Sequence, residues 1–231
     1  MSLFGGGALV VFSLSSVALI ALDNLRSGLG FEDADNPALS IRFLQQRLDI
    51  FTYTGIINVV MGVSLALAAI ALWEIFSKEQ SLLLKSGTLA GFAASAFLFV
   101  NGVLRIQAPG TLLHMAGFDA GWGIAGYLAL QIVGTQGLAS AGGFAFAIWV
   151  ICIGIVNFRS RVFWVGFSWL GILAGTGMLF SAFFGPLLPN SGFIYPVYIA
   201  SILSVLIVWS LAVGISLLFE KRSMRSHFAR T

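Results

Sequence analysis

The chain alternates long apolar runs with short polar stretches. The apolar runs occupy residues 3–22, 50–72, 87–104, 138–157, 162–184 and 195–218. Because a helix needs about 20 apolar residues to cross roughly 30 Å of hydrocarbon, each run predicts a transmembrane helix. We therefore predict an all-α fold: a polytopic transmembrane bundle of six spans, forming a single membrane domain over residues 1–231.

Residues 23–49 form the one long polar segment between these runs and are expected to be an outer loop. Asn36 and Pro37 are a helix-start signal, because Asn caps helix ends and Pro suits the first helical position. Apolar residues then recur at helical spacing from Leu44 to Phe51, with polar residues around them. This pattern predicts an amphipathic helix that lies at the membrane interface and leads into the second span.

The stretch 120–158 carries no charge and is too long for one span. A straight helix of that length would measure about 58 Å, nearly twice the hydrocarbon thickness. We expect the chain to break at 134–137, between a short interfacial or re-entrant helix at 122–133 and the span that follows. The dipeptide at 109–110, Pro-Gly, is expected to break the chain after the third span. A seventh span over 121–133 is the second reading.

Basic residues set the predicted orientation. With six spans, one side of the membrane holds the larger set, Lys78, Lys85, Arg159, Arg161, Lys221, Arg222, Arg225 and Arg230. The other side holds Arg26, Arg42, Arg47 and Arg105. Because basic residues collect on the cytoplasmic side, we expect a multi-pass protein of the cell membrane with both termini, including the tail 220–231, in the cytoplasm. No N-x-S/T sequon occurs, which favours a prokaryotic source.

Composition agrees with a membrane protein. Hydrophobic residues make up 58% of the 231 residues and charged residues only 9%, against about 25% charged in soluble proteins. The formal charge of +3 comes from basic residues at the ends of the apolar runs, so we expect no nucleic-acid partner. The expected partners are membrane lipids, together with a protein partner or a second copy of the chain.

Residues for common membrane cofactors are missing. The only histidines are His114 and His227, so no pair within the spans can hold haem, and no lysine lies mid-span for a retinal Schiff base. We predict no cofactor, although bound lipid or pigment stays open. The acidic run 31–36 lacks the spacing of an EF-hand, so we expect no metal. The one cysteine, Cys152, cannot form an internal disulfide.

Asn101 and Arg105 form the candidate ligand site. They lie four residues apart and so share one face of the third span. An arginine within a membrane needs an anionic partner or a wet cavity, and Asp119 or Asp23 is the expected counter-ion. The alternative is that Arg105 extends to the outer interface while Asn101 bonds between helices.

Small residues favour close helix packing. Gly87 and Gly91, like Gly171 and Gly175, fall on one helix face. With no catalytic residue in view, the first hypothesis is a non-enzymatic accessory or structural subunit, or a homo-oligomer, that packs through these faces. The alternative is a lipid or small-molecule binding or transport protein with a site near Asn101, Arg105 and the break at 134–137. An intramembrane enzyme is the third hypothesis.

The second half resembles a known kind of family. The segment 147–154, the basic loop 158–161 and the run 169–172, Trp-Leu-Gly-Ile, follow one another. This order is similar to uncharacterised bacterial six-span families classed as domains of unknown function, which often also carry an Asn-Pro before span two. The proline usual before the tryptophan is missing here. The resemblance implies the six-span topology and assigns no catalytic residue.

Overall fold

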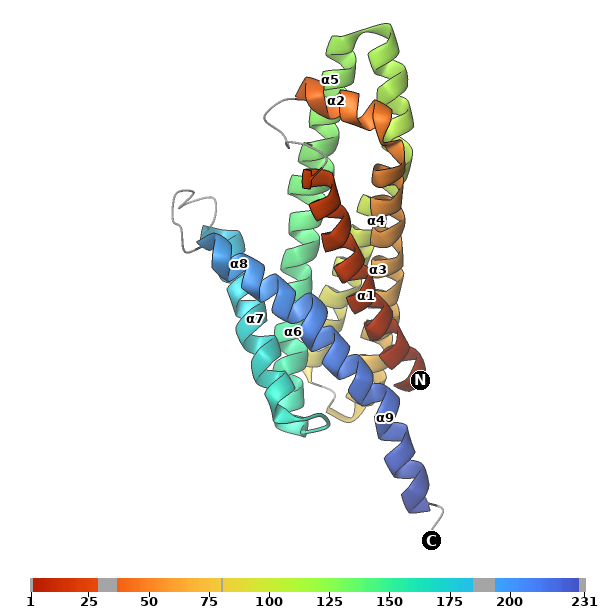
Figure 1. The fold of residues 1–231 in the computed structure, drawn as a ribbon. Coiled ribbons are helices and arrows are strands. Elements are labelled where there is room, and N and C mark those ends of the chain that lie inside the picture. The colour runs from red at the N-terminus through yellow and green to blue at the C-terminus, as the bar shows by residue number, and fades with distance from the viewer. Residues whose placement is uncertain (1, 29–36, 80, 185–193, 229–231) are drawn as a thin grey trace.

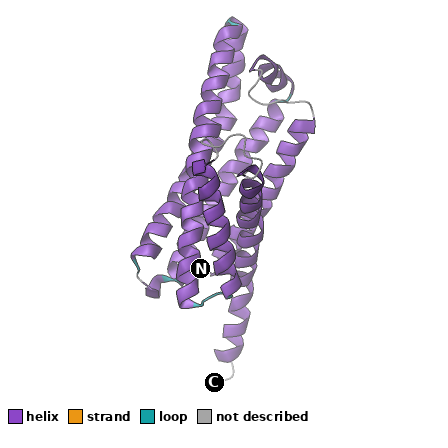
Figure 2. Ribbon diagram, turned by 90° about the vertical axis from the view of Figure 1, so that its left-hand side faces the viewer, coloured by secondary structure: helices purple, strands orange, loops and turns teal. Residues whose placement is uncertain are grey.

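The computed structural model describes residues 2–28, 37–79, 81–184 and 194–228, and these are almost entirely helical (Figure 2). The helices are α1 (Ser2–Gly28), α2 (Pro37–Gln46), α3 (Leu48–Ile75), α4 (Leu82–Phe118), α5 (Ala120–Leu130), α6 (Ser140–Ser160), α7 (Val165–Phe184), α8 (Ile194–Leu203) and α9 (Ser210–Phe228). A 3-10 turn, η1 (Ser77–Glu79), and two π-helical segments, η2 (Gln131–Ala139) and η3 (Ser204–Trp209), complete them. No strand occurs within these described ranges.

Six segments are long and apolar enough to cross a membrane: Leu3–Arg26, Leu48–Ile75, Leu82–Phe118, Ala120–Ser160, Val165–Phe184 and Ile199–Phe219. Each overlaps one predicted span, so the all-α fold with six spans is confirmed. The first residues of α1 and the end of α9 lie at the same end of the bundle (Figure 1). The assignment of that end to the cytoplasm stays a prediction.

The predicted break at 134–137 is wrong. α5, η2 and α6 form one unbroken helical segment, Ala120–Ser160, so neither a re-entrant helix nor a separate seventh span is formed at 121–133. An interfacial position for these residues stays a prediction. Breaking a helix in hydrocarbon would leave several backbone groups without partners, each costing several kcal/mol. Glycine in a helix costs only about 1 kcal/mol. The chain therefore stays helical and takes up the irregularity as a π segment.

The predicted break at Pro109 is wrong for a related reason. α4 continues through this buried proline to Phe118, a helix of 37 residues, or about 55 Å. Asp119 then turns the chain: its backbone N–H bonds to the Met115 carbonyl, and its Oδ1 accepts from the Gly121 N–H. α4 and α5 thus make a long hairpin that stands beyond the rest of the bundle (Figure 1).

The helix predicted after Pro37 is present as α2, and it lies across this hairpin. Its apolar face packs on protein: Ile41, Leu44, Phe51, Leu112 and Tyr127 form one buried cluster. The chain bends where α2 gives way to α3, at Arg47. There Nε and Nη2 of Arg47 each donate to the Asp49 carboxylate at 3.2 Å, which raises the pKa of Arg47. Asn36 lies outside the described residues.

α1 and α9 cross at a pair of glycines. A Cβ on Gly6 would lie 2.8 Å from the Gly214 carbonyl oxygen, and one on Gly214 would lie 3.0 Å from the Gly6 oxygen. Further along, Ser13 Oγ donates to the Ile207 carbonyl at 3.1 Å. Beyond these contacts, α1 and α8 diverge toward the hairpin end (Figure 1).

Candidate functional site: a cavity between the two halves of the bundle

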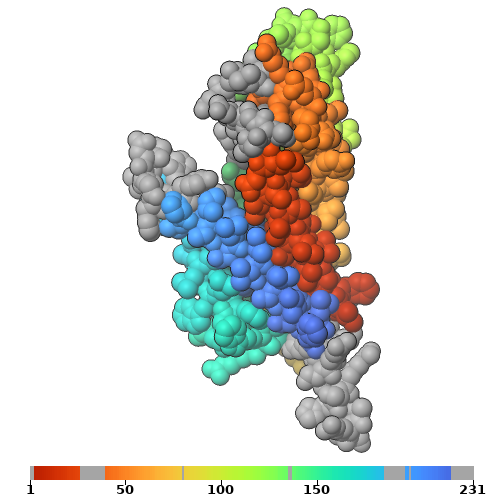
Figure 3. Space-filling model, in the orientation of Figure 1, coloured from red at the N-terminus to blue at the C-terminus, as the bar shows by residue number. Residues whose placement is uncertain are grey.

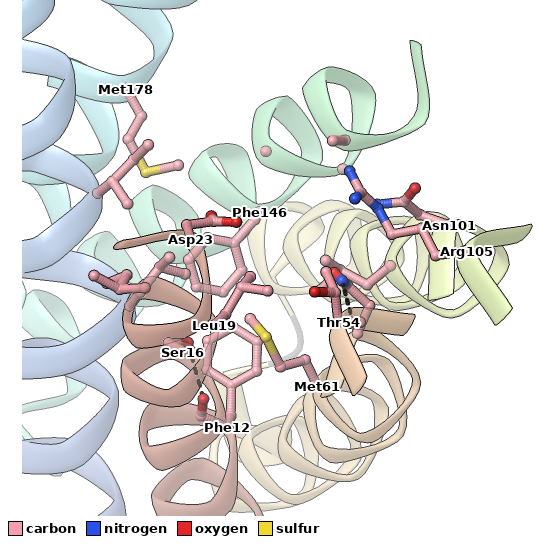
Figure 4. Close-up of a pocket in the computed structure, with 18 of the residues that line it drawn as sticks. Phe12, Ser16, Leu19, Asp23, Thr54, Met61, Asn101, Arg105, Phe146 and Met178 are labelled. Carbon is pink, nitrogen blue, oxygen red and sulfur yellow. Dashed lines mark hydrogen bonds between the residues drawn. The ribbon is translucent and has the colours of Figure 1, made fainter. Parts of the chain in front are cut away.

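The divergence of α1 from α8 opens a cavity of about 480 Å³. Such a volume falls within the roughly 300–1,000 Å³ typical of ligand pockets. Helices from both halves of the chain line it, through Phe12, Ser16, Leu19, Ile20, Asp23, Arg26, Thr54, Asn58, Met61, Leu98, Asn101, Arg105, Gln131, Ala139, Gly142, Gly143, Phe146, Met178, Ile202 and Leu206. Figure 4 shows ten of these side chains labelled.

One part of the wall is polar and charged. Arg105 and Asn101 come from neighbouring turns of α4 and lie together (Figure 4). Arg26 comes from α1, where its guanidinium carbon lies 5.5 Å from the centre of the Phe51 ring, a cation–π distance. Asp23 precedes Arg26 by three residues, so both reach the cavity from one face of α1.

Most of the rest of the wall is apolar, with Ser16, Thr54 and Asn58 as its polar members. Phe12 of α1 and Phe146 of α6 contact one another with ring centres 5.4 Å apart. Both rings belong to the main hydrophobic core, and Phe146 also packs on Trp149 at 5.7 Å. Met61 and Met178 add flexible thioether side chains, which adapt to ligands of irregular shape. The cavity therefore has an apolar part next to a polar part.

Asn101 has an unused hydrogen-bond acceptor. The residue is 3% exposed, and its buried Oδ1 has no hydrogen-bond partner. Gly134 faces this atom so closely that a Cβ there would lie 3.2 Å from Oδ1. By comparison, Asn58 donates from Nδ2 to the Thr54 carbonyl at 2.8 Å. A buried polar atom without a partner is uncommon in proteins and calls for a physical explanation.

Both π-helical segments border this cavity. η2 contributes Gln131 and Ala139, and η3 contributes Leu206. Gln131 Nε2 donates to the Tyr127 hydroxyl at 2.8 Å, and Ser210 Oγ closes η3 by donating to the Val205 carbonyl at 3.0 Å. π segments inside α-helices occur frequently at functional sites.

The structure brings together part of the site expected from the sequence. Asn101 and Arg105 line the cavity, with Gly134 of the expected break against Asn101. Of the two counter-ions considered, Asp23 lines the cavity, whereas Asp119 caps α5 at the tip of the hairpin. The acidic run 31–36 lies outside the described residues. Among those described, no group of three His, Cys, Asp or Glu side chains could hold a metal ion.

The four glycines expected to pack helices all contact their own chain. A Cβ on Gly87 would meet Cys152, and one on Gly91 would meet the Trp149 ring. Likewise, Gly171 faces Trp209, with a Cβ 2.9 Å from its Nε1, and Gly175 faces Ile151 and the Ala147 carbonyl.

Sequence reasoning missed Arg26 and Gln131 as cavity residues. Arg26 follows an apolar run, as interfacial arginines commonly do. The only feature of the sequence that could have indicated a site there is Asp23, one turn earlier. Gln131 was placed in the short helix before the expected break, and no local pattern separated it from neighbouring residues. Both join the site only through tertiary packing.

A family model described as a domain of unknown function, DUF4386, matches residues 3–220. The chain therefore belongs to this family, in agreement with the resemblance to uncharacterised membrane families found in its sequence. No curated protein and no solved structure matches the chain.

Proposed function

We propose that this member of a family of unknown function binds an amphipathic small molecule from the surrounding bilayer, in the cavity between α1, α4 and α6. The observation that carries the proposal is the division of the cavity wall into two parts. Arg26, Asn101 and Arg105 lie in the polar part, and Phe12, Met61 and Phe146 are among the residues of the apolar part. A molecule with a polar head and a hydrocarbon chain matches such a wall.

The polar part of the wall supplies the selectivity in this proposal. A hydrocarbon chain that moves from lipid into the cavity gains little, because lipid tails are as apolar as the side chains that replace them. A polar head gains more, since hydrogen bonds that involve charged groups contribute about 1.5–3 kcal/mol. Binding therefore depends on Arg26, Asn101 and Arg105 more than on the apolar wall.

The first hypothesis from the sequence, an accessory subunit or homo-oligomer that packs through small-residue faces, has less support. Gly87, Gly91, Gly171 and Gly175 motivated it, and each faces a side chain of its own chain. Binding or transport, the alternative, has a specific site to support it.

Gly143 offers a direct test. It lines the cavity, and a Cβ built on it meets nothing within 4 Å, so a larger side chain would project into open space. Gly143→Leu should fill part of the cavity without disturbing the packing. Gly7→Leu is the matched control, because Gly7 also has open space around it and does not line the cavity. Both changes raise helix propensity by about 0.8–1 kcal/mol.

The experiment extracts the wild type and both variants into native nanodiscs and identifies the lipids held by each after delipidation with mild detergent. We expect one class of amphiphile to stay with the wild type and Gly7→Leu, and to be lost from Gly143→Leu at unchanged thermal stability. Equal retention by all three proteins would refute the proposal.

A further inference from the structure

We infer that the turn between α6 and α7, residues 161–164, binds the headgroup of an anionic phospholipid at the membrane surface. In this assignment Arg161 and Arg159 hold the phosphate, and the exposed aromatic side chains beside them pack on the glycerol and acyl part of the lipid. The turn does not line the cavity, so the inference goes beyond the proposed function and is independent of it.

The turn lies at a membrane surface. Ala120–Ser160 and Val165–Phe184 are each long and apolar enough to cross a membrane, so the short turn that joins them reaches an interface. Trp164 in this turn is 73% exposed, and tryptophan is enriched at membrane interfaces. The turn and the start of α7 (turquoise) form an open surface at the lower end of the molecule in this view (Figure 3). A lipid headgroup can therefore reach the turn.

The turn is fixed by its one inward-facing residue. Phe163 is 7% exposed, and its ring meets the ring of Phe76 with centres 5.7 Å apart. Its backbone N–H donates to Asn157 Oδ1 at 2.7 Å. Arg161 and Trp164, which precede and follow this anchored part, are exposed. Because buried contacts already hold the backbone, a ligand of these two side chains does not have to order the turn on binding.

Arg161 has a backbone conformation that its own side chain disfavours. Its φ of 53° and ψ of 34° fall in the left-handed region, and it is the one non-glycine residue with a positive φ in the part of the chain that the structure describes. Glycine commonly fills this position after a helix, because a Cβ is strained there. The backbone of the turn therefore favours glycine, and only the side chain gives a reason for arginine. Strained residues of this kind cluster at binding sites.

The two arginines have no anionic partner among the described residues. Both are exposed, and neither forms an ion pair with a described acidic side chain. Glu74 and Glu79 lie on either side of Phe76, which packs on the turn, and neither pairs with the arginines. Guanidinium groups near a membrane surface attract anionic lipids and can donate two parallel hydrogen bonds to a phosphate.

Exposed aromatic rings continue from the arginines into the spans. Phe158, next to Arg159, is 45% exposed and meets the ring of Trp169 on α7 with centres 5.6 Å apart. Trp164 lies over Gly166, where a Cβ would meet its ring. A phospholipid has a phosphate followed by glycerol and acyl chains, so it contacts both the arginines and these rings. A free anion would use the arginines alone.

The test measures the choice between two phospholipids with identical acyl chains. The protein is placed in nanodiscs that contain equal amounts of phosphatidylglycerol, which is anionic, and phosphatidylcholine, which is zwitterionic. Native mass spectrometry then gives the ratio of the two lipids that stay bound. We expect the wild type to retain phosphatidylglycerol over phosphatidylcholine by about ten-fold or more, since each arginine near the surface adds attraction for an anionic lipid.

Arg161→Gly is the sharpest variant, because it removes the guanidinium and also relieves the left-handed strain. We expect the lipid ratio to fall by about five-fold or more while the thermal stability is kept or raised. Arg161→Lys keeps the charge and should keep most of the ratio, and Arg159→Gln should lower it. Arg42→Gln is the matched control: Arg42 is exposed on α2, at the other end of the bundle, and its loss should leave the ratio unchanged (Figure 1).

Three results would overturn the inference. The first is a lipid ratio in Arg161→Gly that equals the wild-type ratio. The second is an equal fall in Arg42→Gln, which would show that any basic residue at a membrane surface has the same effect. The third is displacement of phosphatidylglycerol by millimolar inorganic phosphate, which would make the ligand a free anion. Gly143→Leu, which fills the cavity, should leave the ratio unchanged, so failure of this inference and failure of the proposed function are separate results.

Discussion

Replacing Asn157 by alanine will lower the free energy of unfolding by about 2–3 kcal/mol. Asn157 is 3% exposed at the end of α6, where it holds the turn into α7. Its Oδ1 accepts from the Phe163 N–H at 2.7 Å, and its Nδ2 donates to Ser168 Oγ at 2.7 Å. The same residue's carbonyl accepts from the N–H of Arg161, which adopts the left-handed conformation with φ 53°.

The magnitude follows from the groups that lose a partner. A buried backbone N–H left unsatisfied, as Phe163 would be, costs about 1–3 kcal/mol. The bond between Asn157 and Ser168, which is fully buried, is of the interhelical kind that averages about 0.6 kcal/mol in membrane proteins. Together these losses give the expected 2–3 kcal/mol. Ser168→Ala alone removes only the smaller part.

The assay is reversible unfolding in mixed micelles, followed by circular dichroism, for Asn157→Ala, Ser168→Ala and the double variant. The cycle should show that the two changes are not additive, because the residues share one hydrogen bond. Ser160→Ala is the matched control: its Oγ bonds only to the Val156 carbonyl of its own helix, and its loss should change stability by under about 0.5 kcal/mol. A loss in Asn157→Ala no larger than in this control would refute the reasoning.

Two further predictions concern helix packing. Gly102→Ala places a Cβ 2.7 Å from the Gly55 carbonyl oxygen, so α3 and α4 must move apart. The same unfolding assay should show that the free energy of unfolding falls by about 1–3 kcal/mol, and an unchanged value would contradict this close approach. Cys152 is 7% exposed and packs on Gly87. Its thiol should therefore react with a membrane-permeant maleimide only when the protein unfolds. Rapid labelling of the folded protein would show that α4 and α6 do not pack as described.

The spans were predictable because the need for about 20 apolar residues per crossing is a local requirement that each run meets on its own. The pairing of Asn101 with Arg105 was predictable for a similar reason, since residues four apart share a helix face. α2 was also predictable from Pro37 and the apolar spacing after it. Its apolar face packs on the hairpin, however, and that contact depends on Leu112 and Tyr127 far along the chain.

The continuous helices were not predictable from breaking residues alone. Pro109 and Gly134 disfavour a helix in water, where the freed backbone groups bond to solvent. Within the packed bundle, neighbouring helices and a local π adjustment accommodate the freed backbone groups, so the helix persists through both positions. The cavity was beyond the sequence because Arg26 of α1 and Arg105 of α4 come together only through tertiary packing, in which α1 and α4 both pack on α3.

The central claim is that an amphiphile occupies the cavity, and photo-cross-linking tests it most directly. A single-chain amphiphile with a diazirine in its oleoyl chain is added to the protein in nanodiscs and irradiated, and the labelled residues are mapped by mass spectrometry. We predict labels on cavity residues such as Met61 and Phe146, and an excess of the same amphiphile without the diazirine should remove them. Labels on exposed residues such as Leu173 should be left unchanged by this competitor. Labels confined to exposed residues, with none in the cavity, would contradict the account.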